Sequence, residues 1–321
     1  MKALGIYRGN AAAALLLATM VASAQTATPA PGVSLDLARA RAPLISDLRY
    51  ELALAVPAAK DRPISGNVVL RFALADAARP LVLDFEPDRA QTVRLTANGV
   101  AAAPQSVNGH LVIPAAALRR GENTLEIGFT AGDGPLNRSD DQLFTVFVPA
   151  QARKAIPCFD QPDLKASWSI TLEHPAAWQS VSNGAEIERV VTDDRARVRF
   201  AATKPIPTYL VSFVAGDLRI ETAVRDGRTL RMFHRESDEA KVKSNRDAIF
   251  DLHVRSLAFM AEYTGISYPF DKYDFVLLPT FPFPGMEHVG ATSYDADQLM
   301  LEDSATQKEH LWRARLIHRG S

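Results

Sequence analysis

Apolar and polar residues alternate along most of the sequence between Leu48 and Ala223. In residues 50–56 and 68–74, every second position holds a large apolar side chain. Because successive side chains of a strand point to opposite faces, each run predicts a strand with one buried face. Shorter runs of the same kind occur at residues 81–85, 93–97, 111–114, 124–129, 168–173, 197–200 and 209–214.

Turn signals separate these runs. Asn98-Gly99, Asn108-Gly109 and Asn183-Gly184 are dipeptides that favour tight turns, because both residue types tolerate a left-handed backbone. Short strands joined by such turns predict a mainly β fold. We expect an antiparallel sandwich or a saddle-like antiparallel sheet rather than a parallel α/β domain.

The pattern changes after the turn at residues 225–228. Ser237 is expected to cap a helix, with apolar residues recurring at helical spacing as far as Tyr263 and with Gly265 ending it. The segments that follow are a strand at 273–279, a loop at 281–290, an extended segment from 293 and a helix at 306–317. This order predicts the incomplete start of an α/β domain.

The first residues have the three-part layout of a secretory signal. Lys2 and Arg8 precede an apolar run at residues 11–21, and Ala22-Ser23-Ala24 supplies a small-x-small cleavage pattern. The alternative is an uncleaved membrane anchor, but this run is shorter than the ~20 residues that span a bilayer. We expect an exported protein, periplasmic or extracellular, with no membrane span after signal cleavage.

A length of 321 residues predicts about two domains. The expected division has four parts. They are a signal peptide at residues 1–24, a flexible leader at 25–45, a β-domain at 46–224 and the start of an α/β domain at 225–321.

Composition excludes several kinds of function. Lys and Arg number 36 against 37 Asp and Glu, so no basic excess offers a surface for nucleic acid. The single cysteine, Cys158, cannot form an internal disulfide and excludes cysteine-rich metal sites, and we expect it to be a buried, small apolar residue. The sequence also has no Gly-x-Ser-x-Gly nucleophile elbow, no phosphate loop and no glycine-rich dinucleotide turn.

The loop at residues 282–290 carries the clearest chemical signal. Glu287 lies there among two prolines and two glycines, between two expected strands. Such a loop can hold one carboxylate in a fixed direction, with bare backbone open to a ligand along the sheet edge. A carboxylate placed in this way suits a protonated amine. The residues alone support a solvated turn glutamate equally well.

Two segments resemble the aminopeptidase N family of zinc metallopeptidases. Residues 283–294, FPGMEHVGATSY, are similar to the family's Gly-x-Met-Glu-Asn signature, with His288 where asparagine is commonest. Residues 147–168, FVPAQARKAIPCFDQPDLKASW, resemble the segment that closes the family's N-terminal β-domain. The resemblance implies a saddle-like β-domain followed by a thermolysin-like catalytic domain.

The resemblance also implies a substrate and its contacts. The family's substrates are peptides with a free N-terminus. The residue matching Glu287 holds the substrate's α-amine, and backbone near Gly285 and Met286 lines the first side-chain pocket. His288 joins these as a candidate substrate-binding residue. Val146 and Val148 occupy positions where many members place a second polar anchor for the amine.

The metal motif that this chemistry needs is missing. It is His-Glu-x-x-His on a helix, in which two imidazoles bind zinc and the glutamate activates water. None of the seven histidines is followed by glutamate, and no two are four residues apart. His318 is a possible remnant of the first ligand, but Arg319 follows it.

We therefore expect the N-terminal part of an exported zinc aminopeptidase, truncated before its zinc helix. This chain is then expected to hold no metal, to have no catalytic residues of its own and to be inactive. The alternative is a non-catalytic exported β-sandwich that binds a peptide or a protein partner.

Overall fold

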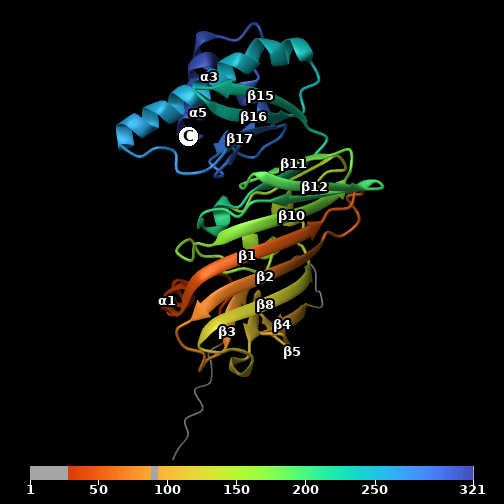
Figure 1. The fold of residues 1–321 in the computed structure, drawn as a ribbon, viewed down its shortest axis with the longest axis vertical. Coiled ribbons are helices and arrows are strands. Elements are labelled where there is room, and N and C mark those ends of the chain that lie inside the picture. The colour runs from red at the N-terminus through yellow and green to blue at the C-terminus, as the bar shows by residue number, and fades with distance from the viewer. Residues whose placement is uncertain (1–27, 88–92, 321) are drawn as a thin grey trace, which may run out of the picture.

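The computed structural model describes residues 28–87 and 93–320 of the chain, and the predicted signal peptide lies outside these residues. Two parts follow one another along the long axis (Figure 1). The lower part contains β1 to β14, and the upper part contains β15 to β19 with helices α3 and α5. This arrangement matches the predicted order of a mainly β domain followed by an α/β segment.

The lower part begins with helix α1 (Leu35–Arg41), and α2 (Ala152–Ala155) is its other α-helix. Its strands are β1 (Ile45–Ala55), β2 (Ser65–Leu74), β3 (Leu81–Asp84), β4 (Arg94–Ala97), β5 (Val100–Ala102), β6 (Gln105–Val107), β7 (His110–Ile113), β8 (Gly121–Thr130), β9 (Gln142–Phe144), β10 (Ser167–Pro175), β11 (Gln179–Ser182), β12 (Glu186–Thr192), β13 (Arg195–Phe200) and β14 (Phe213–Gly216).

The largest sheet has eight strands in the order β12-β13-β10-β1-β2-β8-β4-β5. Strand β1 pairs antiparallel with β2 on one side but parallel with β10 on the other, in a register that aligns Tyr50 with Trp168. These two rings stack with centroids 3.9 Å apart. The sheet is therefore antiparallel, as predicted, except at this central pair.

The predicted buried faces of β1 and β2 are confirmed. Tyr50, Leu52 and Leu70 are each at most 1% exposed and belong to one continuous core. The run at 209–214 was predicted as one strand, but residues 208–210 form a short 3-10 helix and the strand begins at Phe213. Cys158 is fully buried in the core, and burial raises the pKa of its thiol well above the usual value.

The predicted flexible leader is wrong for residues 35–44, which are helical. Ser34 caps α1 by accepting a hydrogen bond from the Leu37 backbone amide. Arg41, at the end of α1, is 3% exposed and forms a bidentate ion pair with Asp84 on β3 at 2.9 and 2.5 Å. This buried pair fixes the segment to the β-domain, because leaving either charge alone in the core would be costly.

The upper part is built on a five-stranded sheet in the order β15-β16-β17-β19-β18. Its strands are β15 (Arg219–Arg225), β16 (Arg228–His234), β17 (Tyr273–Leu278), β18 (Gly285–Met286) and β19 (Ala291–Asp295), and its helices are α3 (Glu239–Thr264), α4 (Ala296–Leu299) and α5 (Gln307–Gly320). The predicted boundary at residue 225 is one strand late, because β15 already belongs to this sheet.

Helix α3 has the predicted extent with a different cap. Asp238, rather than Ser237, accepts hydrogen bonds from the amides of Ala240 and Lys241. Gly265 ends the helix with a φ of 70°, as predicted. Helices α3 and α5 contact each other, and Figure 1 shows both in the upper part of the molecule.

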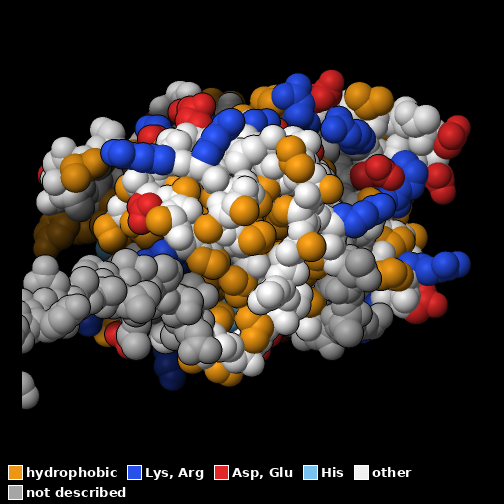
Figure 2. Space-filling model, turned by 90° about the horizontal axis from the view of Figure 1, so that it is seen from below, with side chains coloured by type: hydrophobic (Ala, Val, Ile, Leu, Met, Phe, Trp, Pro, Cys, Tyr) orange, Lys and Arg blue, Asp and Glu red, His pale blue; other side chains and the backbone are white. Residues whose placement is uncertain are grey.

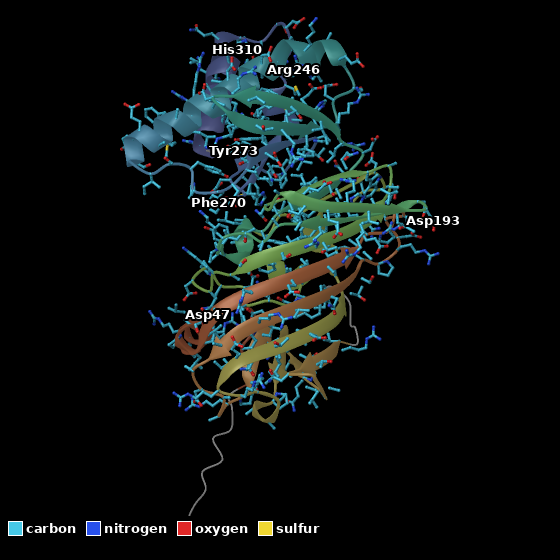
Figure 3. The ribbon with its side chains drawn as sticks, in the orientation of Figure 1. Asp47, Asp193, Arg246, Phe270, Tyr273 and His310 are labelled. Atoms are coloured by element: carbon cyan, nitrogen blue, oxygen red, sulfur yellow. The ribbon has the colours of Figure 1, made fainter. Side chains whose placement is uncertain are left out.

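The two parts share an apolar interface. Phe144, Val181 and Val214 of the β-domain pack in one cluster with Val276 and Phe281 of the upper part. Phe270, labelled in Figure 3 where the parts meet, packs against the β-domain core. Contacts with both the β-domain and the upper part therefore fix the position of the 281–290 loop.

No helix within the described residues is long and apolar enough to cross a bilayer. Figure 2 shows the molecule from below, with hydrophobic side chains scattered over the centre of this face and Lys and Arg side chains gathered mostly along its upper rim.

Candidate amine-binding site at the sheet edge

Glu287 lies at the edge of the five-stranded sheet. Strand β18 pairs antiparallel with β19, Gly285 with Tyr294 and Met286 with Ser293, and it is the last strand on that side. Glu287 follows β18 directly, and its side chain is exposed. The carboxylate thus stands beside bare edge backbone, which is the arrangement expected from the loop sequence.

Buried and partly buried polar groups hold the end of this loop. The Asn183 side-chain amide donates to the Val289 carbonyl at 2.8 Å, and the Tyr268 hydroxyl accepts from the Gly290 amide at 3.1 Å. The Gly290 carbonyl accepts hydrogen bonds from the Lys272 ammonium and from the Asp274 amide. The Val289 carbonyl and both backbone groups of Gly290 therefore have partners, which holds the loop close to Glu287.

Two glycines in this loop are required by geometry. Gly290 has a φ of 69°, and a Cβ there would lie 2.5 Å from the Asn183 carbonyl oxygen. A Cβ on Gly285 would lie 2.9 Å from the Tyr294 ring and 3.2 Å from Leu316 of α5. The absence of a side chain lets α5 approach β18 closely.

A buried charge cluster supports the same loop. Asp274 is 2% exposed and accepts two hydrogen bonds from Arg231, at 3.1 and 2.6 Å, and one from Lys272 at 2.8 Å. Burial lowers the pKa of Lys272, while Asp274 acts in the opposite direction. One carboxylate therefore compensates two cations in this cluster.

A cavity of about 350 Å³ opens between the loop and α5. Gly285 and Glu287 line it on the loop side, and Trp312, Arg315 and Arg319 line it on the helix side. Positions 312, 315 and 319 fall on one face of an α-helix, which brings their side chains to the same wall. This volume lies within the range of small-ligand pockets.

The charged groups of this cavity are not neutralised by the chain. Glu287, Arg315 and Arg319 are exposed, and within the described residues none of them forms an ion pair or hydrogen bond. The Tyr294 ring also lines the cavity and is fully buried; burial chiefly raises the pKa of its hydroxyl, and Glu287 acts in the same sense.

The four predicted contact residues fall into two pairs. Gly285 and Glu287 line the cavity. Met286 is 8% exposed and packs into the interface between the two parts. His288 is fully buried, its Nδ1 lies 3.3 Å from the Ser293 hydroxyl, and burial lowers its pKa to about 3. Met286 and His288 thus face away from the space that a ligand could enter.

The cavity residues on α5 were not predicted. The signal that could have found them is the helical spacing of Trp312, Arg315 and Arg319, two of which are cations. That spacing shows a shared helix face, but it does not show that this face opposes Glu287.

The described residues do not fit a zinc ion. They contain no group of three or more His, Cys, Asp or Glu side chains placed to hold a metal. The His318 Nδ1 lies 2.9 Å from the Ser256 hydroxyl, and its ring packs edge-on against Phe259 with centroids 5.0 Å apart. The next residue, Arg319, brings a positive charge where the motif has the glutamate that activates water.

Comparison with known proteins agrees with this architecture. The Peptidase M1 N-terminal domain model matches residues 46–210, and the Peptidase family M1 domain model matches residues 249–318. Aminopeptidase N of Streptomyces lividans is 27% identical over 302 residues, which are 89% of this chain and 34% of that protein. Mouse (Mus musculus) aminopeptidase Q is 33% identical over 205 residues, 60% of this chain and 36% of that protein.

A plant relative gives the same picture: aminopeptidase M1-A of Oryza sativa subsp. japonica is 29% identical over 174 residues, 54% of this chain and 19% of that protein. The two family models match in chain order, the N-terminal domain first and the family domain second. The chain belongs to the peptidase M1 family, of which it represents the N-terminal portion. It spans about a third or less of the length of these curated relatives.

Proposed function

We propose that this chain binds the amino end of peptides through Glu287. The observation that carries the proposal is an exposed carboxylate at the end of an edge strand. It stands on a loop held by a hydrogen bond to the β-domain and lines a cavity of about 350 Å³. The relatives' names identify them as aminopeptidases, which act at this end of a peptide.

The chemistry of such recognition suits a single carboxylate. The amino end of a peptide is distinguished from the rest of its backbone by its ammonium group. A charge-assisted hydrogen bond to a carboxylate contributes roughly 1.5–3 kcal/mol. Because hydrogen bonds already hold the loop backbone, binding has to order the Glu287 side chain but not the loop. The bare edge of β18 next to it can pair with an extended peptide backbone.

We further propose that the chain binds peptides without hydrolysing them. The family's zinc chemistry requires His-Glu-x-x-His, which this sequence does not contain, and the residues around His318 do not fit the metal. The lineage is that of an exported zinc aminopeptidase, and the part of it present here keeps the amine contact. A non-catalytic peptide-binding module, the alternative interpretation of the sequence, would also bind peptides without hydrolysing them.

Isothermal titration with L-alanyl-L-alanine and its N-acetyl derivative tests amine recognition. We expect binding of the free dipeptide, at least tenfold weaker binding of the acetylated form, and a similar loss in Glu287→Gln. Glu262→Gln, which changes an exposed glutamate on α3, is the matched control. Equal binding of the two peptides would refute the amine contact. Chelator-sensitive release of p-nitroaniline from alanyl-p-nitroanilide would refute the absence of hydrolysis.

Export is proposed from the sequence of residues 1–24, with its basic start, apolar run and Ala22-Ser23-Ala24 site. Expression in a bacterium followed by fractionation and N-terminal sequencing tests it. The expected product is found outside the cytoplasm and begins at Gln25. A cytoplasmic product that keeps Met1 would contradict export.

A further inference from the structure

The cavity beside Glu287 has an unusual balance of charge. It is lined by one carboxylate, Glu287, and two guanidinium groups, Arg315 and Arg319. These three groups have no ionic partner within the described residues, although the helix and the loop face each other across the cavity. The cavity therefore carries a net charge of about +1, so a ligand that brings a carboxylate as well as an ammonium suits it better than one with an ammonium alone.

Some arginines elsewhere in the chain are paired. Arg199 forms an ion pair with Glu188 at 2.9 Å, and Arg71 forms one with Glu51 at 3.0 Å. Nearby on α5, Arg313 is buried and donates to Asn245 at 2.7 Å. Arg315 and Arg319, one helical turn apart, line the same cavity, and within the described residues neither forms an ion pair or hydrogen bond.

We propose that this cavity selects an acidic residue at the amino end of its ligand. Glu287 takes the α-ammonium, as in the proposed function on which this inference rests, and Arg315 and Arg319 take carboxylate groups. A guanidinium is planar and matches a carboxylate with two parallel hydrogen bonds. An amino-terminal glutamate or aspartate carries an α-ammonium and a side-chain carboxylate within one residue. Its ammonium can therefore pair with Glu287 while its carboxylate pairs with the guanidinium groups.

The apolar part of the cavity lining suits a short aliphatic side chain. The Trp312 ring, Leu316 and the Tyr294 ring line the cavity together with the charged groups. Trp312 is held in place by a hydrogen bond of 2.6 Å from its indole N–H to the Gln298 side chain. These surfaces contact methylene groups, while a neutral side chain would leave both guanidinium groups without a partner. The discrimination is therefore electrostatic and falls with rising salt concentration.

Isothermal titration with the C-terminally amidated dipeptides L-glutamyl-L-alaninamide and L-alanyl-L-alaninamide tests the inference, because the amide leaves the side chain as the only source of a carboxylate. We expect the acidic dipeptide to bind at least tenfold more tightly, and the difference to disappear in the double variant Arg315→Gln, Arg319→Gln. Arg255→Gln, an exposed arginine on α3, is the matched control and should keep the full preference. Free L-glutamate, titrated in parallel, distinguishes a free amino acid from the start of a peptide as the source of the ligand.

The outcomes separate this inference from the proposed function. Equal binding of the two dipeptides, both weakened by Glu287→Gln, would overturn the acidic preference and leave amine recognition intact. A preference that survives in the double arginine variant would also overturn it. Failure of Glu287→Gln to weaken either dipeptide would overturn both. Unchanged circular dichroism spectra of the variants would show that they fold.

Discussion

The side-chain amide of Asn183 in the β-domain donates a 2.8 Å hydrogen bond to the carbonyl of Val289, close to Glu287 in the upper part. The same amide donates to the Leu210 carbonyl at 2.9 Å, and its oxygen accepts from the Ser212 amide at 2.7 Å. One side chain thus ties the candidate site to the β-domain.

Replacing Asn183 should loosen this connection. We expect Asn183→Ala to lower the free energy of unfolding by roughly 2–4 kcal/mol, because it leaves buried carbonyl and amide groups without partners. Urea denaturation measures the loss, and hydrogen exchange should show faster exchange at residues 285–291. The control Asn67→Ala, at an exposed position on β2, should change stability by no more than about 0.5 kcal/mol. Equal effects of the two variants would contradict the role assigned to Asn183.

A pair of glycine variants separates backbone strain from steric overlap. Gly290 and Gly99 both have a positive φ, 69° and 81°, but only Gly290 lies against other atoms. Gly99→Ala should cost about 1 kcal/mol of unfolding free energy. Gly290→Ala should cost about 1–3 kcal/mol more, because its Cβ would meet the Asn183 carbonyl. If urea denaturation gives the same loss for both variants, the close contact is not rigid.

His288 should make the protein sensitive to acid. Its folded-state pKa is about 3, so the unfolded chain takes up a proton near pH 6.5 that the folded protein refuses. Its contribution to stability is therefore complete above about pH 6.5 and is lost as the pH falls toward 3. The free energy of unfolding of His288→Asn, relative to that of the wild type, should rise by about 3 kcal/mol when the pH is lowered from 7 to 4. Parallel stability curves from urea denaturation over this range would exclude a buried neutral His288.

The charge cluster around Asp274 should make the stability of the protein sensitive to the nearly isosteric substitution Asp274→Asn. Asp274→Asn leaves Arg231 and Lys272 together without their carboxylate, and we expect a loss of about 3–5 kcal/mol of unfolding free energy. Glu188→Gln removes the exposed partner of Arg199 and should cost less than about 1 kcal/mol. Chemical denaturation of both variants under the same conditions makes the comparison. A loss below 1 kcal/mol for Asp274→Asn would show that water reaches the cluster.

The strands were predictable because alternation reports which face of a strand is buried. Tyr50 and Leu52 are buried as expected. Alternation contains no information about the partner of a strand, so the parallel pairing of β1 with β10 was missed. The helical segment at 35–44 was also missed, because its main anchor is the ion pair of Arg41 with a residue on β3.

For the candidate site, the loop composition indicated Glu287 and the family resemblance gave it a role. The opposite wall could not be predicted, because Arg315 faces the cavity only when α5 packs on β18. The burial of His288 also could not be predicted, because it depends on how the loop packs in the folded protein. Its position next to Glu287 in sequence suggested a shared role, whereas consecutive residues of an extended segment point to opposite sides.

The pairing of β1 with β10 also sets a condition on the order of folding. Tyr50 cannot stack on Trp168 until the ribosome has added more than a hundred further residues, so closing this sheet carries a large entropic cost of long-range contact formation. Until then, one edge of β1 remains open in every nascent chain. Conditions that slow synthesis of the segment around residue 168 should therefore favour aggregation through this edge.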